Sequence, residues 1–207
     1  MPKINHDTRA NILKGALQLF LQKGYKDVSF RDIVEETGLS KGAIYHYFAS
    51  KDELLVAVLE FLVEATKQPV IEQPQNVVKD RESFAELFIN DKMAQIHDFR
   101  KLMGGKSFKI NKLLFFIEAI NESPKLIEMV TGLGLQEKAF IQNSFIGLKN
   151  NGKIPEGKDP ILLADCLHCM LQGTELAVFF LPDDDWVNGV EKMYYKTLND
   201  FFTIISA

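Results

Sequence analysis

The chain has 207 residues, of which 46% are hydrophobic and 25% charged, a composition typical of a soluble globular protein with one large or two small domains. No apolar run reaches the ~20 residues that a membrane-spanning helix needs, and the N-terminus lacks a signal-peptide pattern, so we expect a cytoplasmic protein. The net charge is −4, yet residues 1–51 carry eight basic and five acidic side chains, an excess compatible with DNA binding by the N-terminal part.

The first predicted element is an amphipathic helix over residues 8–23. Its apolar residues recur at three- and four-residue spacing, from Ile12 through Leu17 to Phe20. Gly24 ends the helix, because glycine enters the left-handed conformation at a helix C-terminus without steric cost. We expect this helix to support the elements that follow it.

Residues 29–48 are predicted to form two short helices joined by a tight turn. Ser29 and Ser40 can cap the two helix N-termini, and Gly38 can end the first helix. In the second helix, Ile44 and Phe48 share one face and must be buried. This arrangement is that of a helix-turn-helix, whose second helix enters the major groove of DNA.

The other face of the second helix has an unusual composition. Gly42, Ala43, Tyr45 and His46 lie where a solvated helix would normally carry Glu and Lys. Small residues let a backbone approach a surface closely, and Tyr and His offer hydrogen bonds. Such a face suits a helix that lies against DNA, where the N-terminal residues of a recognition helix reach base edges.

The stretch from Gly38 to Phe48, Gly-Leu-Ser-Lys-Gly-Ala-Ile-Tyr-His-Tyr-Phe, is followed by Ser-Lys-Asp-Glu-Leu-Leu over residues 50–55. These residues resemble the DNA-binding signature of the TetR (tetracycline repressor) family of bacterial transcriptional regulators. The elements predicted along the whole chain give an all-α fold of about nine helices. The resemblance implies a DNA-binding domain over residues 1–50, with its motif at about 29–48, and an effector-binding and dimerisation domain over residues 51–207.

The motif and the resemblance together predict a set of DNA contacts: Ser29, Arg31, Ser40, Lys41, Gly42, Ala43, Tyr45, His46, Tyr47 and Lys51. Lys41 and Lys51 begin helices, where anions are favoured, so both are predicted to bind phosphates. Arg31 can reach a guanine edge or a phosphate, or pair with Glu35 one turn along. Tyr47 lies on the flank and can pack against the domain instead.

A capping box, Ser50-Lys-Asp-Glu53, begins a helix over residues 50–66 that connects the two domains. A loop with Pro69 and Pro74 follows. Further helices are predicted over residues 83–103, 110–121, 124–150 and 160–181, and a last one, capped by the run Asp183–Asp185, to about residue 204.

The last two helices each carry an apolar stripe, which predicts either an interface or packing within the chain. The resemblance implies that they pair with the same helices of a second subunit as a four-helix bundle. The predicted dimerisation residues are Leu163, Met170, Val190, Tyr194, Leu198 and Phe201.

The body offers aromatic and methionine side chains rather than catalytic groups. His97 and His168 are isolated, and no Gly-rich phosphate loop is present, so no enzyme activity, cofactor or metal is predicted. The resemblance implies a cavity for an apolar effector among residues 83–181. Its candidate lining residues are Phe88, Met103, Phe115, Phe116, Met129, Phe145, Cys166 and Met170.

Cys166 and Cys169 stand in the sequence Cys-Leu-His-Cys. A zinc site would need a second pair of ligands, which the sequence lacks. We expect reduced cysteines buried in the core or lining the pocket; redox sensing and metal binding are the alternatives.

These features favour a homodimeric repressor that binds palindromic double-stranded operator DNA and is released by a small, largely apolar effector. A DNA-binding dimer without an effector is the alternative. A helical enzyme is disfavoured, because no nucleophile–base pair is recognisable in the sequence.

Overall fold

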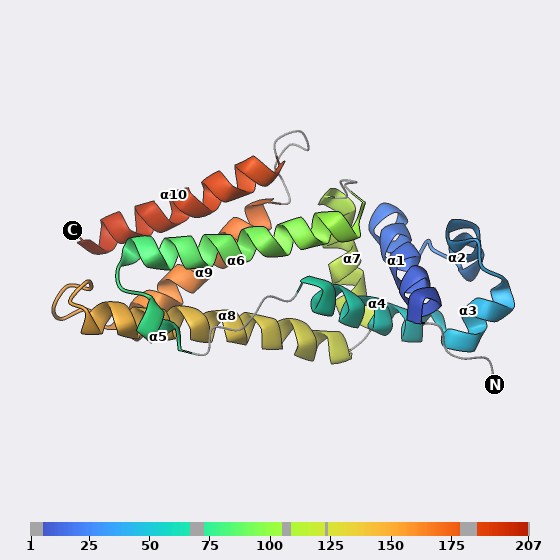
Figure 1. The fold of residues 1–207 in the computed structure, drawn as a ribbon, viewed down its shortest axis with the longest axis horizontal. Helices are drawn as coiled ribbons and strands as arrows, with labels where there is room; N and C mark the ends of the chain where they lie inside the picture. Colours follow the sequence, from blue (N-terminus) through green and yellow to red (C-terminus); the bar gives the residue numbers. More distant parts are fainter. Residues whose placement is uncertain (1–5, 67–72, 105–108, 123, 179–185, 207) are drawn as a thin grey trace. The chain divides into compact units, whose positions relative to one another are not determined.

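The computed structural model describes residues 6–66, 73–104, 109–122, 124–178 and 186–206, and every regular element in these ranges is an α-helix (Figure 1). The prediction of an all-α fold is confirmed. The helices are α1 (His6–Lys23), α2 (Phe30–Thr37), α3 (Lys41–Tyr47), α4 (Lys51–Thr66), α5 (Pro74–Val77), α6 (Arg81–Leu102), α7 (Lys109–Glu122), α8 (Pro124–Asn150), α9 (Pro160–Val178) and α10 (Trp186–Ser206).

One helix, α5, lies where a loop was expected. Pro74 occupies its first turn, where the missing N–H costs nothing, and the Val78 N–H donates to the Pro74 carbonyl at 2.8 Å. A single helical turn is too short to show apolar periodicity, so α5 could not be predicted from the sequence. The predicted loop residue Pro69, the helix end at Leu181 and the capping run Asp183–Asp185 lie outside the described residues.

The chain divides into two compact units, and two of the three boundaries along the chain fall inside α6 and α8. Unit 1 comprises residues 1–67 and 97–130, and unit 2 comprises residues 68–96 and 131–207. The division into a DNA-binding and an effector-binding domain is a functional one and stays a prediction.

The core of unit 1 is organised by the apolar stripe of α1. Ile12, Leu17 and Phe20 are fully buried, as their spacing predicted. The Phe20 ring stacks on Phe115 from α7, with ring centroids 5.9 Å apart, and meets Tyr25 edge-on at 5.3 Å. Helix α1 is thus packed against both the helix-turn-helix residues and α7.

The core of unit 2 is an aromatic cluster. Phe84 of α6 lies edge-on to Phe145 of α8 and to Phe202 of α10, with centroids 5.6 and 6.1 Å apart. Phe88 meets Tyr194 of α10 edge-on at 5.8 Å. Each buried aromatic side chain contributes on the order of 1.5–3 kcal/mol, so this cluster is a main source of stability in unit 2.

Candidate nucleic-acid interface

Helix α2 begins with a capping box at Ser29. The Ser29 hydroxyl accepts a hydrogen bond from the Asp32 N–H, and the Asp32 carboxylate accepts one from the Ser29 N–H at 2.8 Å. Lys23 adds an ion pair to the same carboxylate at 2.6 Å. The Lys23 ammonium and the Ser29 donors hold the pKa of Asp32 well below its ordinary value. The predicted cap at Ser29 is confirmed, and it fixes where the helix-turn-helix starts.

The turn between α2 and α3 has the predicted conformation. Gly38 has φ +68°, and its N–H donates to the Val34 carbonyl at 3.0 Å. Ser40 has extended backbone angles, and its side chain accepts from the Ala43 N–H at 3.1 Å. These two contacts end one helix and begin the next within three residues, as a helix-turn-helix requires.

Helix α3 has the polarity that the sequence predicted. Ile44 and Phe48 are buried, whereas Gly42, Tyr45 and His46 are exposed and Ala43 is half-buried. A Cβ added at Gly42 would find no atom within 4 Å, so nothing in the described chain obstructs the close approach of a surface.

Aromatic contacts arrange the exposed side chains of α3. The Tyr45 ring lies 4.7 Å from the Phe30 ring of α2, and the Lys41 ammonium lies 5.6 Å from the centre of the Tyr45 ring. The His46 and Tyr47 rings are edge-on at 5.4 Å. Tyr47 is half-buried and packs against the core of unit 1, the alternative that the sequence left open for it. The Tyr45 ring and the Lys41 ammonium thus lie next to each other on the exposed side of α3.

Arg31 pairs with Glu35 one turn along α2, with Nε and Oε1 3.0 Å apart. The two side chains are 88% and 64% exposed. An ion pair this exposed contributes at most about 1 kcal/mol, so it does not prevent the guanidinium from reaching DNA.

Lys51 occupies an unexpected position. Its ammonium donates to the carbonyls of Tyr25, Lys26 and Val28 at 3.0, 3.2 and 3.0 Å, and it lies over the Tyr25 ring at 4.4 Å. An ammonium has three donors, and all three are used here. The interpretation of Lys51 as a direct phosphate contact therefore gives way to a structural one in this conformation: it holds the turn between α1 and α2.

The predicted effector-site residues do not gather at one place. Met103 and Phe115 are buried in the core of unit 1, and Met129 packs against that core. Phe88 and Phe145 are core residues of unit 2, whereas Cys166 and Met170 are exposed on α9. Phe116 lies on α7, but its side chain is outside the described part of the structure.

The expectation of buried cysteines is corrected, because Cys166 and Cys169 are both exposed and free of disulfides. Helical spacing places them on the outer side of α9, away from the buried positions Ala164, Leu167 and Leu171. Apolar character alone did not distinguish a core side chain from one on an uncovered face.

The predicted dimerisation residues need a similar correction. Val190, Tyr194, Leu198 and Phe201 are at most 3% exposed, because their own chain covers them in the core of unit 2. They have no free surface to offer a second subunit. Met170 is 37% exposed and Leu163 is half-buried, so these two remain accessible.

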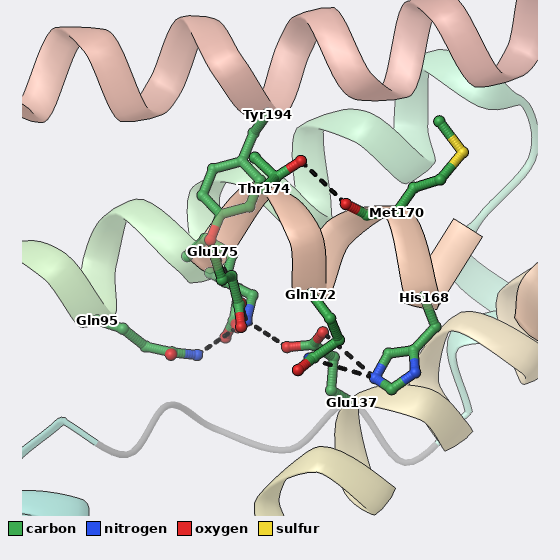
Figure 2. A network of polar contacts seen from close by, with 10 residues as sticks. Gln95, Glu137, His168, Met170, Gln172, Thr174, Glu175 and Tyr194 are labelled. Carbon is green, nitrogen blue, oxygen red and sulfur yellow. Dashed lines mark hydrogen bonds and ion pairs between the residues drawn. The ribbon is translucent and has the colours of Figure 1, made fainter. Parts of the chain in front are cut away.

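A buried charged cluster in unit 2 had no signal in the sequence. Lys92 of α6 is only 8% exposed, and its ammonium contacts the carboxylates of Glu137 on α8 and Glu175 on α9. The Tyr194 hydroxyl donates to Glu175 at 3.3 Å, and His168 Nε2 lies 3.8 Å from Glu137 (Figure 2). Partners that are 45 and 83 residues apart cannot be paired by inspecting a sequence.

The two carboxylates decide the charge of Lys92. Burial by itself lowers its pKa, but the nearby Glu175 and Glu137 outweigh burial and raise the pKa above the ordinary value. Burial and Glu175 likewise raise the pKa of the Tyr194 hydroxyl. Lys92 therefore stays charged and Tyr194 stays neutral at physiological pH.

Within the described ranges, no three His, Cys, Asp or Glu side chains are arranged to hold a metal ion. None of the helices described is both long and apolar enough to cross a bilayer.

A family model described as bacterial regulatory proteins, tetR family, matches residues 12–58. The uncharacterized HTH-type transcriptional regulator YuxN of Bacillus subtilis (strain 168) is 46% identical over 55 residues, which are 27% of this chain and 19% of that protein. The HTH-type transcriptional repressor NemR of Escherichia coli (strain K12) is 37% identical over 71 residues, which are 34% of this chain and 36% of NemR. The chain spans about a fifth to a third of the length of these relatives.

Solved structures resemble nearly the whole chain. A TetR transcription regulator from Haloarcula marismortui ATCC 43049 has a TM-score of 0.66 at 16% identity, covering 95% of this chain and 98% of that one. A regulator from Saccharomonospora viridis in complex with choline has a TM-score of 0.62 at 18% identity, covering 96% and 97%. A SmeT–triclosan complex has a TM-score of 0.59 at 19% identity, covering 96% and 91%. At these identities the likeness establishes the fold.

Proposed function

Because the chain belongs to the TetR family of bacterial regulatory proteins, we propose that it is a homodimeric transcriptional repressor whose operator binding is controlled by a small molecule. It acts where the chromosome is, in the cytoplasm. YuxN is an HTH-type transcriptional regulator, and NemR is an HTH-type transcriptional repressor.

The single observation that carries the proposal is the exposed face of α3. A seven-residue helix with a buried Ile44 and an unobstructed Gly42 presents Lys41, Tyr45 and His46 outward. A helix of this kind fits the major groove, where its first residues read base edges and its lysine binds a phosphate. Ser40 and Ala43, at its N-terminal turn, and Arg31, on α2, complete the set of proposed contacts.

A second copy of the chain is the partner that fits α9. Leu162, Cys166, Cys169, Gly173 and Leu176 are all exposed, and they follow one another at spacings of four, three, four and three residues. That is the spacing of a helix–helix seam, and Leu162 and Leu176 are 63% and 52% exposed. Gly173 leaves room for a helix to approach closely. We propose that this seam, defined by these five residues, meets its counterpart across a two-fold axis.

The effector is proposed to bind in unit 2. Two neighbours with the same fold were solved with choline and with triclosan, a small cation and a largely apolar phenol. Unit 2 combines an aromatic core with the buried Lys92–Glu137–Glu175 cluster, so it contains groups suited to either kind of molecule. An effector with an apolar body and one polar or charged group is what these residues favour.

The test begins with the purified full-length protein and fragments of its own genome. We expect repeated selection to enrich a palindrome bound with a dissociation constant of about 10⁻⁸ M or tighter, with affinity falling as salt rises. Failure to enrich any duplex would contradict the proposal. A library of amines and phenols is then screened for release of that duplex. A palindrome that no compound releases would favour the alternative, a DNA-binding dimer without a small-molecule effector.

A further inference from the structure

The turn between α1 and α2, residues 24–28, is held by side chains from two other helices of unit 1. The Lys51 ammonium from α4 binds three of its carbonyls. The Glu118 carboxylate from α7 accepts the Tyr25 N–H at 2.7 Å. These partners satisfy backbone groups that a turn would otherwise expose to water.

Gly24 makes room for the Glu118 carboxylate. Its φ is +87°, and a Cβ built on it would lie 3.3 Å from Glu118 Oε2. A side chain at this position would therefore be strained by the backbone angle and would also crowd the carboxylate. Gly24 thus allows both the backbone conformation of the turn and the close contact with the Glu118 carboxylate of α7.

The turn leads directly into the DNA-reading motif. Ser29, which caps α2, is the next residue after Val28, and the Tyr25 hydroxyl donates to Asp52 at the start of α4. The direction of α2, and with it that of α3, depends on where this turn is fixed. A base-reading helix must be held within a fraction of an ångström of its productive geometry to keep its affinity.

We propose that Glu118 is a positioning residue for DNA binding, because its carboxylate fixes the turn that sets the position of the helix-turn-helix. This inference rests on the proposed function. Glu118 touches no DNA; it acts through the Tyr25 amide. A carboxylate makes a stronger hydrogen bond to an amide than a neutral acceptor does, and that suits it to hold a turn in one place.

Three substitutions test separately the length, the charge and the hydrogen-bond acceptor of the Glu118 side chain. Glu118→Ala removes the acceptor. Glu118→Asp keeps the charge but withdraws the carboxylate by one methylene, so it should also lose the contact. Glu118→Gln keeps an acceptor at the same reach. Glu122→Ala is the matched control, since Glu122 is an exposed carboxylate one turn along α7.

Operator affinity is measured by fluorescence anisotropy on the duplex selected with the unmodified protein, at a temperature where circular dichroism shows each variant folded. We expect the Ala and Asp variants to bind about 10-fold more weakly, and the Gln variant to stay within about 3-fold of the original. Rescue by Gln but not by Asp is a pattern that a general loss of stability would not produce. Unchanged affinity in the Ala and Asp variants, or equal losses in Gln and Ala, would overturn the inference.

Hydrogen exchange of the Tyr25 amide tests the contact without DNA. We expect strong protection in the original protein and in Glu122→Ala, and at least ~10-fold faster exchange in the Ala and Asp variants. An amide that exchanges equally fast in all of them would show that Glu118 does not hold it. An unmodified protein that binds no duplex would contradict the proposed function, whereas the exchange result would still decide the contact.

Discussion

The helix-turn-helix segment of unit 1 and the core of unit 2 both contain many polar contacts, but they are built over different distances along the chain. Around α2 and α3, Ser29 bonds to Asp32 and Ser40 to Ala43, each over three residues. In unit 2, Lys92 joins residues that follow it by 45 and 83 positions. Local caps shape the proposed DNA-binding surface, whereas the long-range cluster connects α6, α8 and α9.

The two regions also use burial differently. The ion pair of Arg31 and Glu35 is exposed on both sides, so water screens it and it can be exchanged for a phosphate. The Lys92 cluster is shielded, so its charges depend on one another. We therefore expect single changes in unit 2 to act on folding and single changes on the DNA-reading face to act on binding.

The largest effect is expected from Lys92→Ala. It leaves Glu137 and Glu175, whose side chains are 16% and 32% exposed, without their cation. Breaking a fully buried pair typically costs about 3–5 kcal/mol, and partial exposure to water reduces that cost, so we expect a loss at the lower end of this range and a melting temperature lower by roughly 10 °C. Lys196→Ala is the control, because Lys196 forms an exposed pair with Asp200 and should change the melting temperature little. Thermal unfolding followed by circular dichroism compares the two.

A neutral version of the cluster sharpens that result. Lys92→Met combined with Glu137→Gln and Glu175→Gln removes all three charges together, so much of the lost stability should return. If the triple variant is as unstable as Lys92→Ala, shape rather than charge governs this part of unit 2.

The next effect concerns the α9 seam. Leu176→Glu is expected to raise the dimer dissociation constant at least ~100-fold, because it places a charge in a surface that must lose its water on pairing. Leu135→Glu is the same change at another exposed leucine, on α8, and should leave the dimer intact. Analytical ultracentrifugation measures the dimer dissociation constant of both variants. If the unmodified protein is a monomer, the proposed dimer interface on α9 is wrong.

A smaller effect should distinguish Lys41 from Lys51, which the sequence predicts as equivalent phosphate contacts. Lys41→Ala should leave the melting temperature unchanged and reduce the salt dependence of operator binding by about one charge. Lys51→Ala should instead lower stability by about 1–3 kcal/mol, because three carbonyls lose their donor. Measuring melting temperature and salt slope for each variant checks the assignment. A normal melting temperature with a reduced slope for Lys51→Ala would restore the phosphate interpretation.

These differences explain what the sequence could predict. The caps at Ser29 and Ser40, the turn at Gly38 and the buried Ile44 depend on neighbours within a few residues, and all of them were predictable. The role of Lys51 was not, because its carbonyl partners lie 23 to 26 residues earlier in the chain.

The apolar stripes of α9 and α10 also show that packing between distant parts of the chain could not be predicted from the sequence. Periodicity identified Tyr194 and Leu198 as apolar positions on one face, but it could not say whether the covering surface belongs to the same chain. Packing within unit 2 buries them, and it leaves Leu162 and Leu176 uncovered instead. Only the folded chain distinguishes a core stripe from an interface stripe.

The smallest expected effect is a pH dependence at the cap of α2. The Lys23 ammonium and Ser29 lower the pKa of Asp32 in the folded protein, so this carboxylate stabilises the fold above its unfolded pKa of 3.8. That contribution is lost as the pH falls below about 4 and through the lower folded value. Lys23→Met should therefore lower the free energy of unfolding slightly at pH 6, and the difference from the original protein should shrink towards pH 3. Lys26→Met is the matched control, an exposed lysine three residues along the chain. Urea unfolding of both variants and the original protein at pH 6 and pH 3 measures these free energies. If Lys23→Met lowers the free energy of unfolding as much at pH 3 as at pH 6, Lys23 does not stabilise the fold through the charge of Asp32.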